Sequence, residues 1–117
     1  MASPRALDKL LLDVRKADRS VRIELRDAVA AHGSAAIEPM VAWIPDAEFS
    51  RFAVRVIEKI AATDWLHDAA IEALQGAYAT APTPEISTDV EETLLRLGAK
   101  VRKPARKRTP AAVAATA

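Results

Sequence analysis

The stretch AAIE at residues 35–38 recurs at residues 69–72, and the pair VR at residues 21–22 recurs at residues 54–55. The two offsets are 34 and 33 residues, about a third of the chain. Matched apolar and charged positions at a nearly constant spacing are typical of one structural unit used more than once. The repeat therefore favours a stacked helical array over a protein built around a single cleft.

The composition agrees with helices. The chain has 117 residues, of which 50% are hydrophobic, 4% are aromatic and only three are glycine. This length and apolar content suffice for one domain with its own core, and the residue types suit helices better than a sheet protein with many turns. We therefore expect an all-α fold.

Apolar periodicity and capping signals predict six helices within residues 4–98. Pro4 begins the first helix, Asp18 or Ser20 caps the second, Ser34 the third, and Thr83 with Pro84 starts the last. Gly33 and Gly98 stand where left-handed residues end helices. The expected ranges are 4–17, 18–33, 34–44, 48–62, 63–80 and 83–98.

Each expected helix has an apolar face. The helix over 48–62 is the most strongly periodic, with Phe49, Phe52, Ala53, Val56 and Ile60 on one side. In the helix over 18–33 the same reasoning places Val21, Leu25, Ala28 and Val29 toward the core. Trp43 and Trp65, near helix ends, are expected to pack within or between the units.

The repeated unit resembles a HEAT-like repeat. One unit has Val21-Arg22, Leu25, Gly33 and the stretch 36–40, and the next has Val54-Arg55, Ile60 and the stretch 70–74. Val90, Leu94 and Gly98 fit the first helix of a third unit. The resemblance covers about residues 20–98 and implies a right-handed α–α superhelical stack of about three helical hairpins. It also implies an interaction scaffold for proteins or nucleic acids that is only rarely an enzyme.

Charge divides the chain into two parts. Residues 1–99 hold 11 Lys or Arg and 16 Asp or Glu, for a net charge of −5, whereas residues 100–117 hold six cations and no acid, for +6. The second part has little apolar area to bury, so we expect a helical domain over 1–99 and a disordered basic tail over 100–117. This asymmetry favours contact with polyanions.

The repeat also aligns cations. Arg22 and Arg26 correspond by the 33-residue offset to Arg55 and Lys59, and stacking would place them, with Arg51, in a basic lane. Two alternatives stay open: these cations pair with acids of other helices, or they solvate an exposed face. The tail adds Lys100, Arg102, Lys103, Arg106, Lys107 and Arg108, which predict salt-sensitive phosphate contact without base readout. Its alternatives are a solubilising tail or one that folds back on the acidic last helix.

Catalytic and metal signals are weak. Without cysteine there is no thiolate site, and the two histidines, His32 and His67, fall at non-equivalent positions. Spaced carboxylates such as Asp64 with Asp68 are common on solvated faces, so no catalytic residue, metal or cofactor is predicted. No segment has the composition of a signal peptide or a membrane span, which predicts a cytoplasmic protein.

These observations support three hypotheses of function. The first is a small non-enzymatic scaffold that binds a partner protein, with the tail adding non-specific affinity for nucleic acid. The second is a DNA- or RNA-binding protein that uses the basic lane together with the tail. The third, an enzyme acting on nucleic acid, rests only on the resemblance.

Overall fold

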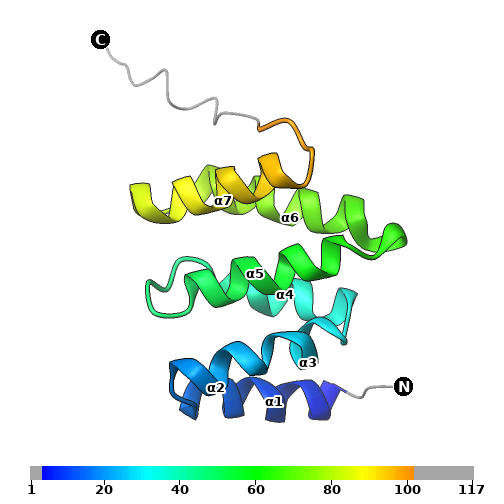
Figure 1. Cartoon of the computed structure of the whole chain (residues 1–117), viewed down its shortest axis with the longest axis vertical. Coiled ribbons are helices and arrows are strands. Elements are labelled where there is room, and N and C mark those ends of the chain that lie inside the picture. The colour runs from blue at the N-terminus through cyan, green and yellow to red at the C-terminus, as the bar shows by residue number, and fades with distance from the viewer. Residues whose placement is uncertain (1–3, 102–117) are drawn as a thin grey trace.

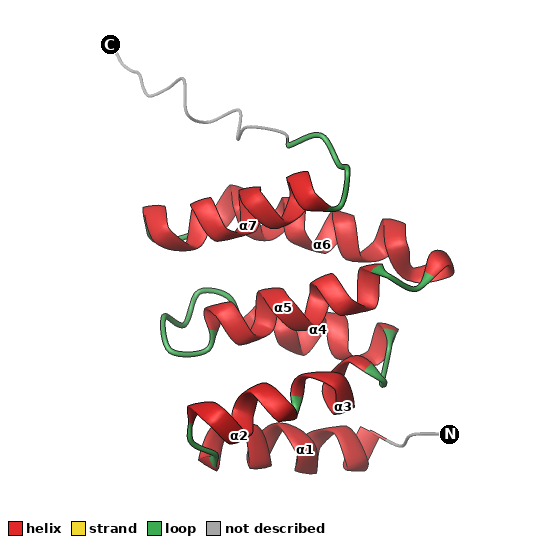
Figure 2. Ribbon diagram, viewed as in Figure 1, coloured by secondary structure: helices red, strands yellow, loops and turns green. Residues whose placement is uncertain are grey.

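A computed structural model describes residues 4–101, and within this range the chain is helical with no strand (Figure 1, Figure 2). The expected all-α fold is therefore confirmed. The helices are α1 (Pro4–Lys16), α2 (Arg19–Glu24), α3 (Arg26–Ala30), α4 (Ser34–Trp43), α5 (Ser50–Ala61), the one-turn 3-10 helix η1 (Asp64–Leu66), α6 (His67–Thr80) and α7 (Pro84–Arg96).

The helices are arranged in tiers along the longest axis of the molecule (Figure 1). α1 packs beside α2 and α3, α4 packs beside α5, and α6 packs beside α7. Helix α5 joins the tiers, because it contacts α3 on one side and α6 and α7 on the other. As a result, α1 and α7 lie at opposite ends of the stack.

The repeated positions of the sequence are repeated positions of the core. Ala36 of α4 and Ala70 of α6 are fully buried, and so are Met40 and Leu74 one turn further along the same helices. The small alanines let neighbouring helices approach, and the longer side chains fill the space between tiers. The core face predicted for α5 is confirmed, because Phe49, Phe52, Ala53, Val56 and Ile60 are all buried.

Local signals explain most helix ends. The Asp18 carboxylate accepts a hydrogen bond from the Val21 amide at 3.3 Å, and the Thr83 hydroxyl accepts one from the Ile86 amide at 3.3 Å, as expected of N-caps. Gly33 has φ 61° and Gly98 has φ 81°, the left-handed values that glycine adopts most readily. Ser34 is the first residue of α4 and does not cap it; Gly33 takes the N-cap position.

Three details of the expected helix over 18–33 are wrong, and one of them is Ala28, which was expected to face the core and is exposed. The expected helix is divided at Leu25 into α2 and α3, although neither glycine nor proline marks the division. Val21 is 45% exposed, whereas the next residue, Arg22, is buried. The α2 segment is therefore rotated so that Arg22 faces the core, because its guanidinium finds hydrogen-bond acceptors there.

The two tryptophans differ. Trp43 is buried, with its ring centroid 5.1 Å from that of Phe49 and 6.0 Å from that of Phe52. Trp65 lies in η1 and is 78% exposed, so the expected packing role is confirmed for Trp43 and wrong for Trp65. The short 3-10 turn holds Leu66 in the core and leaves its neighbour in solvent.

The chain after α7 returns to the body. Ala99 and Val101 pack against the core, and the side-chain amide of Gln75 donates a hydrogen bond to the Lys100 carbonyl. The other five cations of the expected tail lie outside the described residues. Between residues 4 and 101, no helix combines the length and apolar content needed to span a membrane.

Candidate functional site

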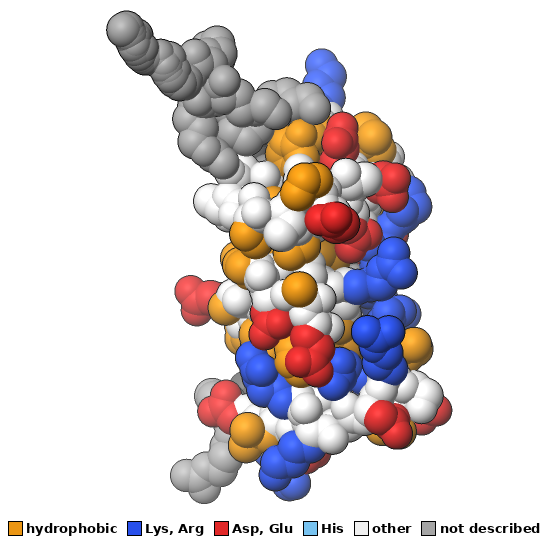
Figure 3. Space-filling model, turned by 90° about the vertical axis from the view of Figure 1, so that its left-hand side faces the viewer, with side chains coloured by type: hydrophobic (Ala, Val, Ile, Leu, Met, Phe, Trp, Pro, Cys, Tyr) orange, Lys and Arg blue, Asp and Glu red, His pale blue; other side chains and the backbone are white. Residues whose placement is uncertain are grey.

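The stacking of α3 on α5 brings the five cations of the predicted lane to one side of the molecule. Arg22 lies on α2, Arg26 on α3, and Arg51, Arg55 and Lys59 on α5. The space-filling view shows Lys and Arg side chains gathered along one edge, with acidic side chains between and above them (Figure 3). Which cations are available to a ligand depends on their partners.

Arg22 is a structural residue. Its Nε donates to the Val14 carbonyl at 3.2 Å, and its Nη2 donates to the Ala17 carbonyl at 2.9 Å and to Glu48 at 3.2 Å. The two carbonyls lie at and just after the C-terminal end of α1, where backbone acceptors have few partners within the helix, and the Val14 carbonyl also accepts from the Ala17 amide at 3.2 Å. The guanidinium also lies 4.4 Å from the ring centroid of Phe49. Arg22 thus ties α1 to the loop between α4 and α5.

Arg55 is also engaged within the fold. It pairs with Glu58 at 3.1 Å and with Asp89 of α7, and it donates to the Thr93 hydroxyl at 3.1 Å. Glu58 in turn accepts two hydrogen bonds from Arg96, which raise the pKa of that guanidinium. This network joins α5 to α7 and engages both terminal nitrogens of Arg55, whereas its buried Nε has no hydrogen-bond partner among the described residues.

Lys59 is paired between helices. Its ammonium lies 2.8 Å from the carboxylate of Asp27 on α3. Both side chains are largely exposed, so the pair contributes little stability, but it reduces the positive charge at that end of the lane. Pairing between helices, one of the alternatives left open by the sequence, therefore holds for Arg22, Arg55 and Lys59.

Arg26 and Arg51 form no ion pair or hydrogen bond with any other described residue, and neither does Arg19 on α2. The Nε atom of Arg26 is buried and has no partner in residues 4–101. Burial lowers the pKa of Arg26, and the positive charges of Arg55 and Arg51 lower it further. Three arginines therefore lack a partner among the described residues, and for one of them burial and like charge outweigh the favourable effect of Glu58.

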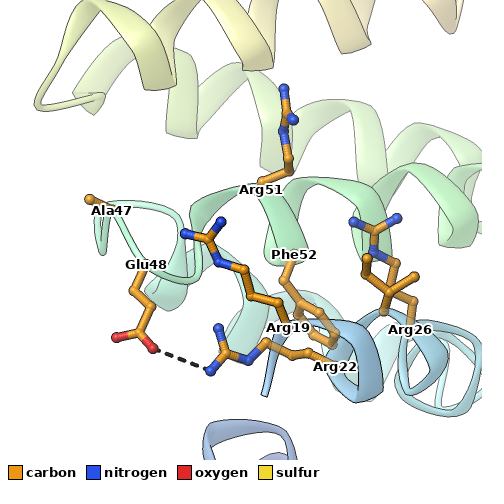
Figure 4. A pocket seen from close by; sticks show the side chains of 8 residues that line it. Arg19, Arg22, Arg26, Ala47, Glu48, Arg51 and Phe52 are labelled. Carbon is orange, nitrogen blue, oxygen red and sulfur yellow. Dashed lines mark hydrogen bonds and ion pairs between the residues drawn. The ribbon is translucent and has the colours of Figure 1, made fainter. Parts of the chain in front are cut away.

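These three arginines surround a hollow of about 470 Å³ between α2, α3 and α5. In the close view, Arg19 and Arg22 lie beside Glu48, Arg51 lies above Phe52, and Arg26 lies on the far side of Phe52 (Figure 4). Glu48 is the only acid that lines the hollow, and it is paired with Arg22. The full lining is Arg19, Arg22, Ile23, Arg26, Ala47, Glu48, Arg51 and Phe52.

Arg19 was missed by the sequence reasoning. The 33-residue offset relates α2 and α3 to α5. The residue 33 positions after Arg19 is Phe52, which is not a cation, so the repeat does not indicate Arg19. A helical signal was nevertheless present, because Arg19, Arg22 and Arg26 are spaced by three and four residues and so share one face.

An acidic surface borders the hollow on the side of α7. A second, more open depression is lined by Arg51 together with Pro84, Glu85, Thr88, Asp89 and Glu92. Arg51 is therefore the last cation before a carboxylate-rich region. A polyanion held in the hollow would be repelled there, which confines its path to α2, α3 and the start of α5.

The remaining candidates carry no comparable site. Nδ1 of His67 donates to the Ala61 carbonyl at 3.0 Å, and Asp89 is bound to Arg55. Among residues 4–101, no group of three or more His, Asp or Glu side chains is arranged to hold a metal ion. Lys100 is exposed, and the other tail cations are outside the part of the chain that the structure describes.

Comparison of the chain with family models, with curated proteins and with solved structures found no match.

Proposed function

We propose that this chain is a small non-enzymatic helical-repeat module of HEAT-like type that binds the phosphate backbone of nucleic acid through the hollow lined by Arg19, Arg26 and Arg51. The observation that carries the proposal is a hollow lined by three arginines that form no ion pair with any described residue. Guanidinium groups without partners suit phosphate, because each offers a planar set of donors that matches two phosphate oxygens.

The HEAT-like assignment is supported by the tiers of paired helices and by the equivalent burial of Ala36 with Ala70 and of Met40 with Leu74. In such a stack the surface loops and helix faces of successive units are free to bind, while the core is shared between units.

The environment of Arg26 also supports anion binding. A side chain with a buried Nε that lacks a partner, beside two other arginines, raises the free energy of the unbound state. Successive phosphates along the hollow would supply negative charge to these cations. The basic tail, whose cations number five beyond residue 101, would extend the contact without sequence readout.

Protein binding is a second candidate, favoured by one observation. Ile23 lines the same hollow and is 55% exposed, so an acidic peptide with an apolar side chain would fit as well as a phosphate backbone. A fitting peptide would bury Ile23, whereas a phosphate backbone would not need to. Ile23→Ser should therefore weaken peptide binding and leave nucleic-acid binding unchanged.

The proposal is tested by fluorescence anisotropy of the full chain with a mixed-sequence duplex of about 20 base pairs at about 50 mM salt. We expect Arg26→Glu with Arg51→Glu to weaken binding by about tenfold or more, because two phosphate contacts become repulsions. The control is Lys9→Glu with Lys16→Glu on α1, which changes the net charge equally but lies outside the hollow. Equal losses in the two double variants would contradict the proposal.

A further inference from the structure

An open depression lies on α6 where the chain returns after α7. Its volume is about 400 Å³, and its lining is His67, Asp68, Ile71, Glu72, Gln75, Ala99 and Lys100. The buried side chain of Gln75 fixes the returning segment, because its amide donates a hydrogen bond to the Lys100 carbonyl. The described chain ends one residue later, at Val101, at the α7 end of the stack (Figure 1). The depression is therefore next to the point where the chain continues.

The surface around this depression is acidic. Residues 64–99 hold seven acids and one cation, for a net charge of −6. Asp68 and Glu72 line the depression, and α6 contains no Lys or Arg. A segment that continues from Val101 therefore enters a region of negative potential.

Glu91 of α7 lies at the same end of the stack. Asp89 and Thr93 face α5, where both contact Arg55. Glu91 is two residues from each of them, so its side chain points about 160–200° further round the helix axis, away from α5. Because α6 and α7 pack side by side and are joined by a short turn, Glu91 is about level with Glu72 along the two helices. We call the surface formed by Asp68, Glu72 and Glu91 the end face.

Helix α7 has a second acidic face, on the side of α5. Glu85, Asp89 and Glu92 line a separate depression there together with Arg51. Asp89 is already paired with Arg55, and no residue of the segment 97–101 lines this depression. Its acids therefore provide a control for charge alone.

From these observations we infer that residues 102–108 of this same chain bind the end face. The segment directly follows Val101 and holds five cations and no acid within seven residues. Its charge is therefore complementary to that of the end face. The sequence left open a tail that folds back on the last helix, and the depression places the main binding surface on α6.

The length and tethering of the segment suit this surface. Seven extended residues span about 23 Å, whereas the depression covers eight residues of α6 from His67 to Gln75, or about 12 Å. A segment tethered at Val101 meets the end face at an effective concentration of about millimolar, so exposed ion pairs that are weak one by one suffice. The segment also continues the cover that Ala99 and Val101 begin by packing against the core. A terminal unit of a helical array needs such a polar cover.

Binding of the segment to the end face would oppose its binding to nucleic acid. This consequence rests on the proposed function, in which the same five cations contact phosphate. The end face and a nucleic acid then compete for the segment, so the end face lowers the affinity of the free protein for nucleic acid.

The inference is tested by paramagnetic relaxation enhancement on the full chain. The chain has no cysteine, so Ala105→Cys places one nitroxide label in the middle of the segment and leaves its charge unchanged. We expect the amide signals of α6 around Glu72 to broaden most and those of α1 to stay sharp. The broadening should fall at about 1 M salt, where the Debye length is about 3 Å. Strongest broadening around the hollow, or no effect of salt, overturns the inference.

Neutralising variants separate binding from the tether, which by itself keeps the label near α6. Glu72→Gln with Glu91→Gln should reduce the broadening of α6 by about twofold or more. Glu85→Gln with Glu92→Gln changes the net charge equally on the other face of α7 and should leave the broadening unchanged. Equal effects of the two double variants overturn the inference. Broadening between chains, in a mixture where the label and the nitrogen isotope are on different molecules, also overturns it.

Duplex binding by the unlabelled chains measures the competition. Glu72→Gln with Glu91→Gln should bind the duplex about threefold more tightly than the control Asp8→Asn with Asp13→Asn on α1, which changes the net charge equally. Equal affinities overturn the competition, even with the label on the end face. If no chain binds the duplex while the label stays on the end face, the proposed function fails and the binding of the segment stands.

Discussion

The same substitution at two arginines one helical turn apart should have opposite effects on stability. Arg22→Met removes a donor from each of the Val14 and Ala17 carbonyls and from Glu48, and it removes one of the two cations over Phe49, the other being Arg15. The Val14 carbonyl still accepts from the Ala17 amide at 3.2 Å, but the Ala17 carbonyl and Glu48 each lose a charged donor. Loss of a partner from a buried polar group costs about 1–3 kcal/mol, so we expect the free energy of unfolding to fall by about 1–3 kcal/mol.

Arg26→Met removes no hydrogen bond within the described residues. It deletes a buried Nε that has no partner there and relieves the repulsion from Arg51 and Arg55. The Met side chain keeps most of the packing of the arginine stem. We therefore expect the free energy of unfolding to rise by about 1 kcal/mol, which corresponds to an increase in Tm of about 4–8 °C for a domain of this size.

Urea denaturation of both variants, followed by far-UV circular dichroism, measures these changes. Arg19→Met is the matched control, because Arg19 is exposed on the same helix face and should change stability by less than about 0.5 kcal/mol. If Arg26→Met loses as much stability as Arg22→Met, Arg26 is a structural residue, and the division between engaged and available arginines is refuted.

Three other predictions test the packing of the stack. Asp89→Ala should lower the free energy of unfolding by about 3 kcal/mol in urea denaturation, because the partly buried Arg55 loses its ion pair with α7. The control Glu85→Ala, at an exposed position of the same helix, should change it by less than about 0.5 kcal/mol. Gly33→Ala should lower the free energy of unfolding by about 1–3 kcal/mol in the same assay. The residue has φ 61°, and a Cβ there would lie 3.3 Å from the Leu66 side chain. A neutral result would contradict the left-handed backbone assigned to Gly33. Trp43→Ala should lower Tm by more than about 10 °C, whereas Trp65→Ala should leave it nearly unchanged, and similar losses at both positions would refute the assigned burial.

The helices were predictable because their signals are local. Asp18, Thr83 and Gly33 act within a few residues of their own position, and the apolar spacing of α5 is sufficient to define its buried face. The division of α2 from α3 at Leu25 was not predictable, because it has no local signal. It follows from the contacts of Arg22 with the end of α1 and with Glu48, which depend on how the helices pack.

The candidate site was predictable in part. The repeat located the helices whose cations gather, but it did not distinguish Arg22, Arg55 and Lys59, which have partners, from Arg26 and Arg51. The pairing of Arg55 with Asp89 could have been predicted from the sequence. Asp89 follows Arg55 by 34 residues, which is the offset of the repeat, so the two residues occupy equivalent positions in successive units. The pairing of Lys59 with Asp27 depends instead on the tertiary register, which periodicity does not specify.

The most direct measurement is the salt dependence of binding to duplex DNA by the full chain and by the triple variant Arg19→Gln, Arg26→Gln and Arg51→Gln. Each phosphate contact contributes about −0.9 to the slope of log K against log of the salt concentration. We predict that the slope of the triple variant is shallower than that of the wild type by about 2.7. Equal slopes, with affinity retained, would show that the hollow does not contact phosphate and would contradict the proposed function.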